Sequence, residues 1–413
     1  MVTVNEATTK PTTGEPTSST PETPRALDLV FLQDATGSQS PYINAARDGI
    51  AKICQKIIQS QRIDADKLRF GLIAFRDYEP QDYTMVAKDY GFTDNIETIR
   101  NHLSALRAMG GGDGPEAQAA AMSKALNMPW REDAMKVVVL ITDAPPHGIG
   151  EAGDFFPQGS PDRQDPLNIT RQMAQRGIVL HVIACEPTLS QQYSYASEFY
   201  QAIVDLTGGR MLPLLSADSL PDYILGASIE TAALEGLLKS HASDIDAELS
   251  SRSVSAEEYA EKLYKQFNQQ GVKVDSLEVP DSYVDSRENT KNITTWMGAT
   301  SLQEAKGKIA PSTTSRLQQV SMPGPSSSSP GLFASSIGSL PFGSKRMRTG
   351  PMFGGMPPPA VLTAPSMPIA HATPAVPLPA SSVTSTGIQQ EQVLRMVRQV
   401  QARSSPANFG PKA

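Results

Sequence analysis

The sequence has little cysteine, few aromatic residues and no long apolar run. Only two of its 413 residues are cysteines, Cys54 and Cys185, which excludes a disulfide framework and a cysteine-rich zinc module. No apolar stretch approaches the roughly 18 residues that cross a bilayer, and residues 1–25 lack the apolar core of a secretory signal. We therefore expect an intracellular protein of the cytoplasm, without a membrane span.

The charge is distributed unevenly along the chain. The formal net charge is -7, yet residues 305–413 hold ten Lys/Arg and a single acid, Glu391. An acidic body does not suit a domain that wraps nucleic acid. The cluster at 345–348, Lys-Arg-Met-Arg, resembles a nuclear-targeting signal and leaves a nuclear location open, although a solvated run of charge explains it better.

Composition also divides the chain into parts. Residues 311–386 contain 14 of the 33 prolines and no acid, so they cannot bury enough apolar surface to offset the entropy of ordering. Near the C-terminus, Val393, Val397 and Val400 recur at helical spacing, which suits either a partner-binding helix or a marginal one. The expected parts are a disordered N-terminal tail (1–25), a folded domain (26–240), a helical or irregular extension (241–310), a disordered Pro/Ser/Gly-rich linker (311–386), and a short amphipathic helix with its tail (387–413).

Runs that are typical of buried strands alternate with amphipathic segments across 26–240. Residues 41–60 illustrate the second kind, with isoleucines spaced three and four apart. The strand-like runs lie at 26–32, 68–75, 83–90, 136–142, 178–185 and 208–214. This alternation predicts an α/β fold with a doubly wound, mostly parallel sheet and helices on both faces.

Carboxylates and hydroxyls follow several of these strands. Asp34, Thr36 and Ser38 come directly after the first, a glycine-rich loop ends in Asp113-Gly-Pro-Glu116, and Thr142-Asp143 follows the most apolar strand. Ligands of an open α/β sheet bind beyond the carboxyl ends of its strands, so these three loops should meet at one edge.

No basic residue is interleaved among these acids. Converging carboxylates repel one another unless a cation or protons intervene, and hard oxygen ligands suit Mg²⁺, Mn²⁺ or Ca²⁺. The hydroxyls of Thr36 and Ser38 could bind such a metal, with Asp34 holding a bound water or a hydroxyl proton. For residues 34–38 alone, a helix cap ahead of 41–60 is the alternative explanation.

Together, these motifs resemble the von Willebrand factor type A domain and its metal-ion-dependent adhesion site. The resemblance covers about 26–235, and Glu116 is similar to the glutamate of integrin β subunits. The loops also resemble type A domains found beside alpha-kinase domains. The resemblance implies Thr36, Ser38 and Glu116 directly on the metal, and Asp34 and Asp143 acting through waters. It gives Asp113 no place directly on that metal, although in integrin β subunits it would help form a flanking cation site.

Three functions remain open at this point. The first is a protein-binding module, without enzymatic activity, whose Mg²⁺ or Mn²⁺ binds an Asp or Glu of a partner. The second is a metal-assisted enzyme, or a regulatory part of an alpha-kinase-type phosphorylation system. Catalysis needs a general base, and His147 is the one candidate near the loops, although a hydrogen-bonded loop histidine is the commoner case. The third is a scaffold that the metal only stabilises. Gly110–Gly112 lacks the pattern of a phosphate-binding loop.

Overall fold

The computed structural model describes residues 26–59, 63–251, 254–280, 282–313, 315–318 and 382–405, and these belong to one compact unit. The expected tail at 1–25, most of the expected linker, the basic cluster at 345–348 and residues 406–413 lie outside the described residues. Within the described ranges, no helix combines the length and apolarity needed to cross a membrane.

A six-stranded sheet forms the centre of the structure, in the order β3-β2-β1-β4-β5-β6. Every neighbouring pair is parallel except β2 and β3, which leaves an antiparallel strand at one edge. The strands are β1 (Leu27–Asp34), β2 (Leu68–Phe75), β3 (Ala87–Thr93), β4 (Met135–Thr142), β5 (Ile178–Cys185) and β6 (Met211–Leu214). This confirms the predicted doubly wound, mostly parallel sheet.

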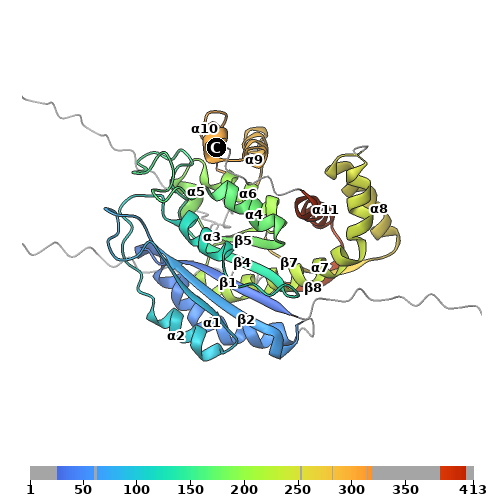
Figure 1. Cartoon of the computed structure of the whole chain (residues 1–413), viewed down its shortest axis with the longest axis horizontal. Coiled ribbons are helices and arrows are strands. Elements are labelled where there is room, and N and C mark those ends of the chain that lie inside the picture. Colours follow the sequence, from blue (N-terminus) through green and yellow to red (C-terminus); the bar gives the residue numbers. More distant parts are fainter. Residues whose placement is uncertain are drawn as a thin grey trace, which may run out of the picture. The chain divides into compact units, whose positions relative to one another are not determined.

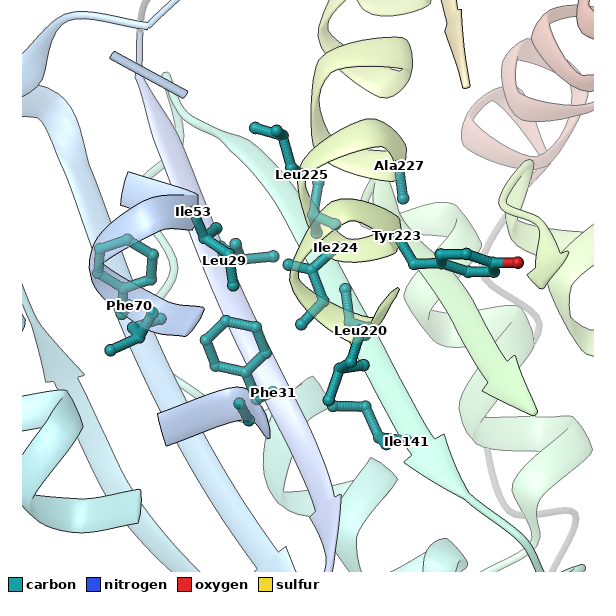
Figure 2. Close-up of a cluster of buried hydrophobic side chains, with 14 of the residues drawn as sticks. Leu29, Phe31, Ile53, Phe70, Ile141, Leu220, Tyr223, Ile224, Leu225 and Ala227 are labelled. Atoms are coloured by element: carbon teal, nitrogen blue, oxygen red, sulfur yellow. The ribbon is translucent and has the colours of Figure 1, made fainter. Parts of the chain in front are cut away.

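Helices cover both faces of this sheet (Figure 1). One face carries α1 (Ser40–Gln59), α2 (Ile96–Ala105) and α7 (Leu220–Ser250); the other carries α3 (Gln118–Leu126), α4 (Pro166–Gln175) and α6 (Ala196–Thr207), with the short α5 (Thr188–Gln192) before α6. Figure 2 shows the first turns of α7, where Leu220 and Ile224 lie among Leu29, Phe31 and Ile141 of the sheet. Because β1 and β4 are buried on both faces, they carry the apolar runs Leu29–Leu32 and Val137–Ile141.

The third strand differs from the sequence prediction, since β3 runs over Ala87–Thr93 instead of 83–90. The reason lies in Asp82, whose Oδ1 accepts hydrogen bonds from the backbone N–H groups of Thr84 (2.6 Å) and Met85 (3.3 Å). These bonds hold the chain in a turn, so the strand starts only after it.

Beyond the sheet, the chain continues as α8 (Ala256–Gln269), β7 (Lys273–Glu278), α9 (Arg287–Gly298) and α10 (Leu302–Lys306). It resumes as β8 (Ser382–Gly387), which pairs antiparallel with β7, and α11 (Gln390–Ser404). Both ends of the expected 311–386 linker therefore carry structure, because Leu317 also forms a bridge with Tyr283. Local composition did not indicate either pairing.

The helix expected within 387–413 is α11, and it packs on the rest of the unit. Its apolar side, with Val393, Met396, Val397 and Val400, is buried in one cluster with α7 and α8. Arg395 forms an ion pair with Glu230 in the middle of α7. Residues 382–405 are therefore part of the folded body, although the sequence alone left their role open.

Candidate metal centre

Asp34 ends β1 and is fully buried. Its Oδ1 accepts hydrogen bonds from the backbone N–H (2.9 Å) and the hydroxyl (2.6 Å) of Thr36, and its Oδ2 accepts one from the Thr142 hydroxyl (2.7 Å). Burial, followed by the charge of Asp143, raises the pKa of Asp34 to about 7. The Thr36 hydroxyl points its proton at Asp34, which leaves its oxygen lone pairs free to bind a cation.

The rest of the first loop forms a 3₁₀ turn, Gly37–Gln39, that leads into α1. Thr36 precedes this turn without capping it through its side chain, so the helix-cap explanation does not account for its hydroxyl. Ser38 is exposed on the same turn. The N–H of Gly37 donates to the carbonyl of Gly110 (3.3 Å), which ties the first loop to the second.

Glu116 brings a second carboxylate to this place. Its side chain is 4% exposed, and its Oε2 is buried without a hydrogen-bond partner in the described part of the chain. Gly111 shows how close it lies to Thr36, since a Cβ there would stand 2.8 Å from Oε1 of Glu116 and 3.3 Å from Cβ of Thr36. Burial and the charges of Asp34 and three further aspartates raise the pKa of Glu116 to about 11. An orphaned buried acceptor of this kind calls for a cation or a proton.

Asp143 supplies the third carboxylate, from the loop after β4, and it is buried. The second and third loops are tied together, because the N–H of Glu116 donates to the carbonyl of Pro145 (2.9 Å). The carbonyl of Ala144 accepts hydrogen bonds from Gln118 Nε2 (2.9 Å) and from the Tyr200 hydroxyl (2.6 Å). The backbone beside Asp143 is therefore held firmly against α3 and α6.

No Lys or Arg forms a salt bridge with Asp34, Glu116 or Asp143 among the residues that the structure describes. Arg76 lies buried nearby, but its guanidinium donates to Ala35 O (3.1 Å), Thr84 Oγ1 (2.6 Å) and Arg107 O (2.5 Å). Arg76 therefore links the loops by hydrogen bonds and does not neutralise the three carboxylates. Three carboxylates with two hydroxyls form a hard donor set, which fits Mg²⁺ or Mn²⁺.

Of the five residues predicted from the sequence, four are thus buried together at the carboxyl edge of the sheet: Asp34, Thr36, Glu116 and Asp143. Ser38 lies on the surface of the first loop, and its side chain makes no hydrogen bond within the described residues. No contact fixes the direction of the Ser38 hydroxyl in the described chain, and its part in holding a metal stays a prediction.

A second acidic group lies beside this site, and the sequence pointed to two of its members, Asp113 and His147, but not to Asp77. Asp77, Asp113 and His147 offer ligand atoms within 4.8 Å of one another. Both nitrogens of His147 already face carboxylates, Nε2 toward Asp77 Oδ1 (2.7 Å) and Nδ1 toward Asp154 Oδ1 (2.8 Å). Burial lowers the pKa of His147, but these hydrogen bonds outweigh it and raise the pKa to about 9. His147 is therefore a protonated histidine held between two aspartates.

Asp113 of this second group also acts on Glu116 through its charge. The Oδ2 atom of Asp113 accepts a hydrogen bond from the N–H of Phe155 (2.9 Å). The Oδ1 atom of Asp113 and the Oδ2 atom of Asp77 are buried without hydrogen-bond partners in the described chain. Burial raises the pKa of Asp113 to about 6. A signal for Asp77 was present in the sequence, because it stands two residues after the end of β2, at the same edge as Asp34 and Asp143.

Residues 28–203 match the family model of the von Willebrand factor type A domain, and this range encloses all five predicted site residues. The chain contains a von Willebrand factor type A domain. Type A domains generally act as protein-interaction modules, and they often bind a divalent metal ion.

Two curated relatives match part of the chain. An ariadne-like RING finger protein of Acanthamoeba polyphaga mimivirus is 28% identical over 198 residues, which is 46% of this chain and 18% of the relative. The alpha-protein kinase vwkA of Dictyostelium discoideum is 33% identical over 138 residues, 33% of this chain and 21% of the kinase. The chain thus spans about a fifth of each. Among solved structures, the pilus adhesin SpaC of Lactobacillus rhamnosus GG matches with a TM-score of 0.38 at 15% identity, over 51% of this chain and 31% of the adhesin.

Proposed function

We propose that the type A domain is a divalent-cation-dependent protein-binding module. Mg²⁺ or Mn²⁺ would be held directly by Thr36, Ser38 and Glu116, and through waters by Asp34 and Asp143. An Asp or Glu of a partner protein would fill a remaining position on the metal. The observation that carries the proposal is the convergence of three buried carboxylates from three loops, none of which is paired with a basic side chain of the residues that the structure describes.

The electrostatic repulsion among these buried carboxylates supports a bound cation. The raised pKa values of Asp34 and Glu116 mean that the ionised site is unfavourable by itself. A divalent cation offsets most of that repulsion and gives the Oε2 of Glu116 a partner, and an open coordination position on the metal can then bind a further carboxylate.

The same geometry argues against catalysis by this site. His147, the candidate base, has both nitrogens engaged by aspartates and a raised pKa, so it is charged near neutral pH and cannot accept a proton. The two relatives also carry different activities in their names, a RING finger and an alpha-protein kinase. Each match covers only about a fifth of the relative, so neither named activity is carried over to this chain.

An alternative follows from the kinase relative. The 138-residue match to vwkA supports a regulatory part in an alpha-kinase-type phosphorylation system. The two proposals differ in the partner, since the alternative requires binding to a kinase catalytic domain and a change in its phosphorylation rate. Adding the purified protein to an alpha-kinase assay, with and without Mg²⁺-site substitutions, separates them.

The direct test is calorimetry of the whole chain with MgCl₂ and MnCl₂. We expect one divalent site, lost in Asp34→Ala and in Ser38→Ala. Ser38 is the sharper position because its side chain is exposed and makes no hydrogen bond in the described chain, so its removal should not disturb the fold. Asp222→Ala is the matched control, since that acid lies on α7 and pairs with Lys52 and Lys56. Unchanged metal binding in both site variants would refute the assignment, and a pull-down with and without EDTA then tests partner binding.

A further inference from the structure

Large apolar side chains are exposed around the metal centre. In the described part of the chain, four such residues are exposed: Tyr83 (73%), Phe155 (63%), Val284 (51%) and Met109 (48%). Single exposed apolar residues are ordinary on protein surfaces. Three of these four, however, stand on the loops that build or support the metal centre, and only Val284 lies elsewhere.

Backbone contacts place each of the three beside that centre. The N–H of Met109 donates to the carbonyl of Ala35 (3.0 Å), inside the first metal loop. The N–H of Phe155 donates to the Asp113 carboxylate (2.9 Å), in the second metal loop.

Tyr83 belongs to the same neighbourhood through Asp82. A Cβ at Gly110 would collide with the carboxylate of Asp82, so the turn that carries Tyr83 lies against the glycines of the second loop. The same carboxylate accepts the N–H of Thr84 (2.6 Å), which fixes the backbone on either side of Tyr83. The backbone beneath each exposed side chain is thus held, while the side chain itself is open to a partner.

We propose that the partner's acidic residue lies in an apolar segment, with large apolar side chains close to it in sequence on either side. This inference rests on the proposed metal-dependent function and adds the chemistry of the partner. The partner's carboxylate would bind the metal, while its apolar neighbours cover Tyr83, Met109 and Phe155, which we call the apolar rim.

Charge decides against an acid-rich partner segment. Carboxylates of this chain lie beneath and beside the rim, since Asp82 is buried under Tyr83 and Asp113 is partly buried beside Phe155. A second acid in the partner would lie close to these negative charges and away from the metal, and like charges at an interface are unfavourable. One acid among apolar residues avoids that repulsion and buries the rim. Residues 319–381 of this chain contain no Asp or Glu, so that segment cannot supply the carboxylate.

The contribution of the rim follows from what aromatic side chains do at interfaces. At the centre of an interface they often carry much of its affinity, although only part of their buried area converts to binding free energy. Removal of one tyrosine or phenylalanine side chain should therefore weaken binding about tenfold.

A displayed peptide library tests the inference on the full chain. Each peptide carries a fixed central Asp or Glu between randomised positions, and selection is run in Mg²⁺ and in EDTA. We expect Mg²⁺-dependent enrichment of peptides with large apolar residues near the acid. The enriched peptides should bind Tyr83→Ala and Phe155→Ala about tenfold more weakly, with Mg²⁺ affinity unchanged. Val284→Ala is the matched control and should bind like the parent protein.

The possible failures are distinguishable. If no peptide is enriched in a Mg²⁺-dependent way, the proposed function is wrong and the inference falls with it. If acidic peptides are enriched without apolar neighbours, or if Tyr83→Ala and Phe155→Ala bind as tightly as the parent, the metal-dependent function stands and the apolar rim is refuted. Both side chains are exposed, so thermal unfolding of the variants should match the parent.

Discussion

Replacing Glu230 by glutamine should loosen the attachment of the C-terminal helix. Glu230 lies in the middle of α7 and is 2% exposed. Its carboxylate accepts hydrogen bonds from Arg210 (2.7 Å) and the backbone N–H of Leu277 (2.9 Å), and it forms an ion pair with Arg395 of α11. One side chain therefore joins α7 to β7, to α11 and to the residue before β6. Glutamine keeps the shape and removes the charge that both arginines need.

The size of the effect follows from the pKa of Glu230. Burial alone would raise this pKa, but Arg395 and Arg210 outweigh it and lower the pKa from 4.5 to about 2. The folded-state pKa lies below the unfolded one, so the stabilisation is complete above pH 4.5 and is lost as the pH falls toward 2. The shift corresponds to about 3 kcal/mol of unfolding free energy at pH 7. Breaking a buried ion pair typically costs a similar amount, about 3–5 kcal/mol.

Urea unfolding of the parent, Glu230→Gln and Glu261→Gln at pH 7 measures this cost. Glu261 pairs with Lys265 on the exposed side of α8, so its variant should leave the midpoint unchanged. At pH 3.5 the difference between the parent and Glu230→Gln should shrink by about 1 kcal/mol, because Glu230 of the unfolded chain takes up a proton below pH 4.5 while the folded carboxylate stays ionised. A cost below about 1 kcal/mol at pH 7, or a cost independent of pH, would contradict the ion-pair account.

Three further predictions concern the metal centre and the core. Glu116→Thr should weaken Mg²⁺ binding in calorimetry while leaving the fold intact, since it removes a negative charge from the site; equal affinity would mean that Glu116 is not a ligand. Arg76→Met should lower the unfolding free energy by about 2 kcal/mol and weaken Mg²⁺ binding, because three loop contacts lose their donor; an unchanged Mg²⁺ affinity would separate Arg76 from the site. His181 is buried, accepts the N–H of Arg210 on Nδ1 (3.1 Å), and has its pKa lowered to about 3 by burial and by Arg395. The unfolded chain therefore binds a proton on His181 that the folded chain does not bind. The unfolding free energy of the parent should fall by about 1.4 kcal/mol per pH unit below about pH 6.5, relative to His181→Gln. Parallel pH profiles of the two proteins in thermal unfolding would refute this.

The sheet and the edge that holds the candidate site could be predicted because their signals are local. A strand buried on both faces is rich in apolar residues, as the centres of β1 and β4 are, and the residues that follow parallel strands must meet at one edge. The positions of Asp34 and Asp143 follow from that rule, whereas Glu116 lies in the loop between α2 and α3 and follows no strand. That they hold a metal stays a prediction.

The remaining features depend on contacts between distant parts of the chain. Asp77 lies 70 residues before His147, and only the fold brings the two side chains together. Strand β8 has a Ser/Thr-rich sequence beside a proline-rich segment, and it becomes a strand because β7, more than 100 residues earlier, offers its edge. The apolar spacing of α11 was visible, but its sequence does not identify the surface of α7 and α8 that it covers.

The pairing of β7 with β8 makes residues 319–381 an insertion whose two ends are anchored close together. The backbone N–H of Gln318 donates to the carbonyl of Ser282 (2.7 Å). Ser382 pairs with Glu278, which stands four residues before Ser282. A protease cut within the insertion would therefore break the chain without removing the contacts of α11. Two separately made fragments, one ending at residue 318 and the other beginning at 382, have the surfaces needed to reassemble by complementation. The insertion could likewise be exchanged for a short linker or a reporter domain while the type A domain keeps its C-terminal helix.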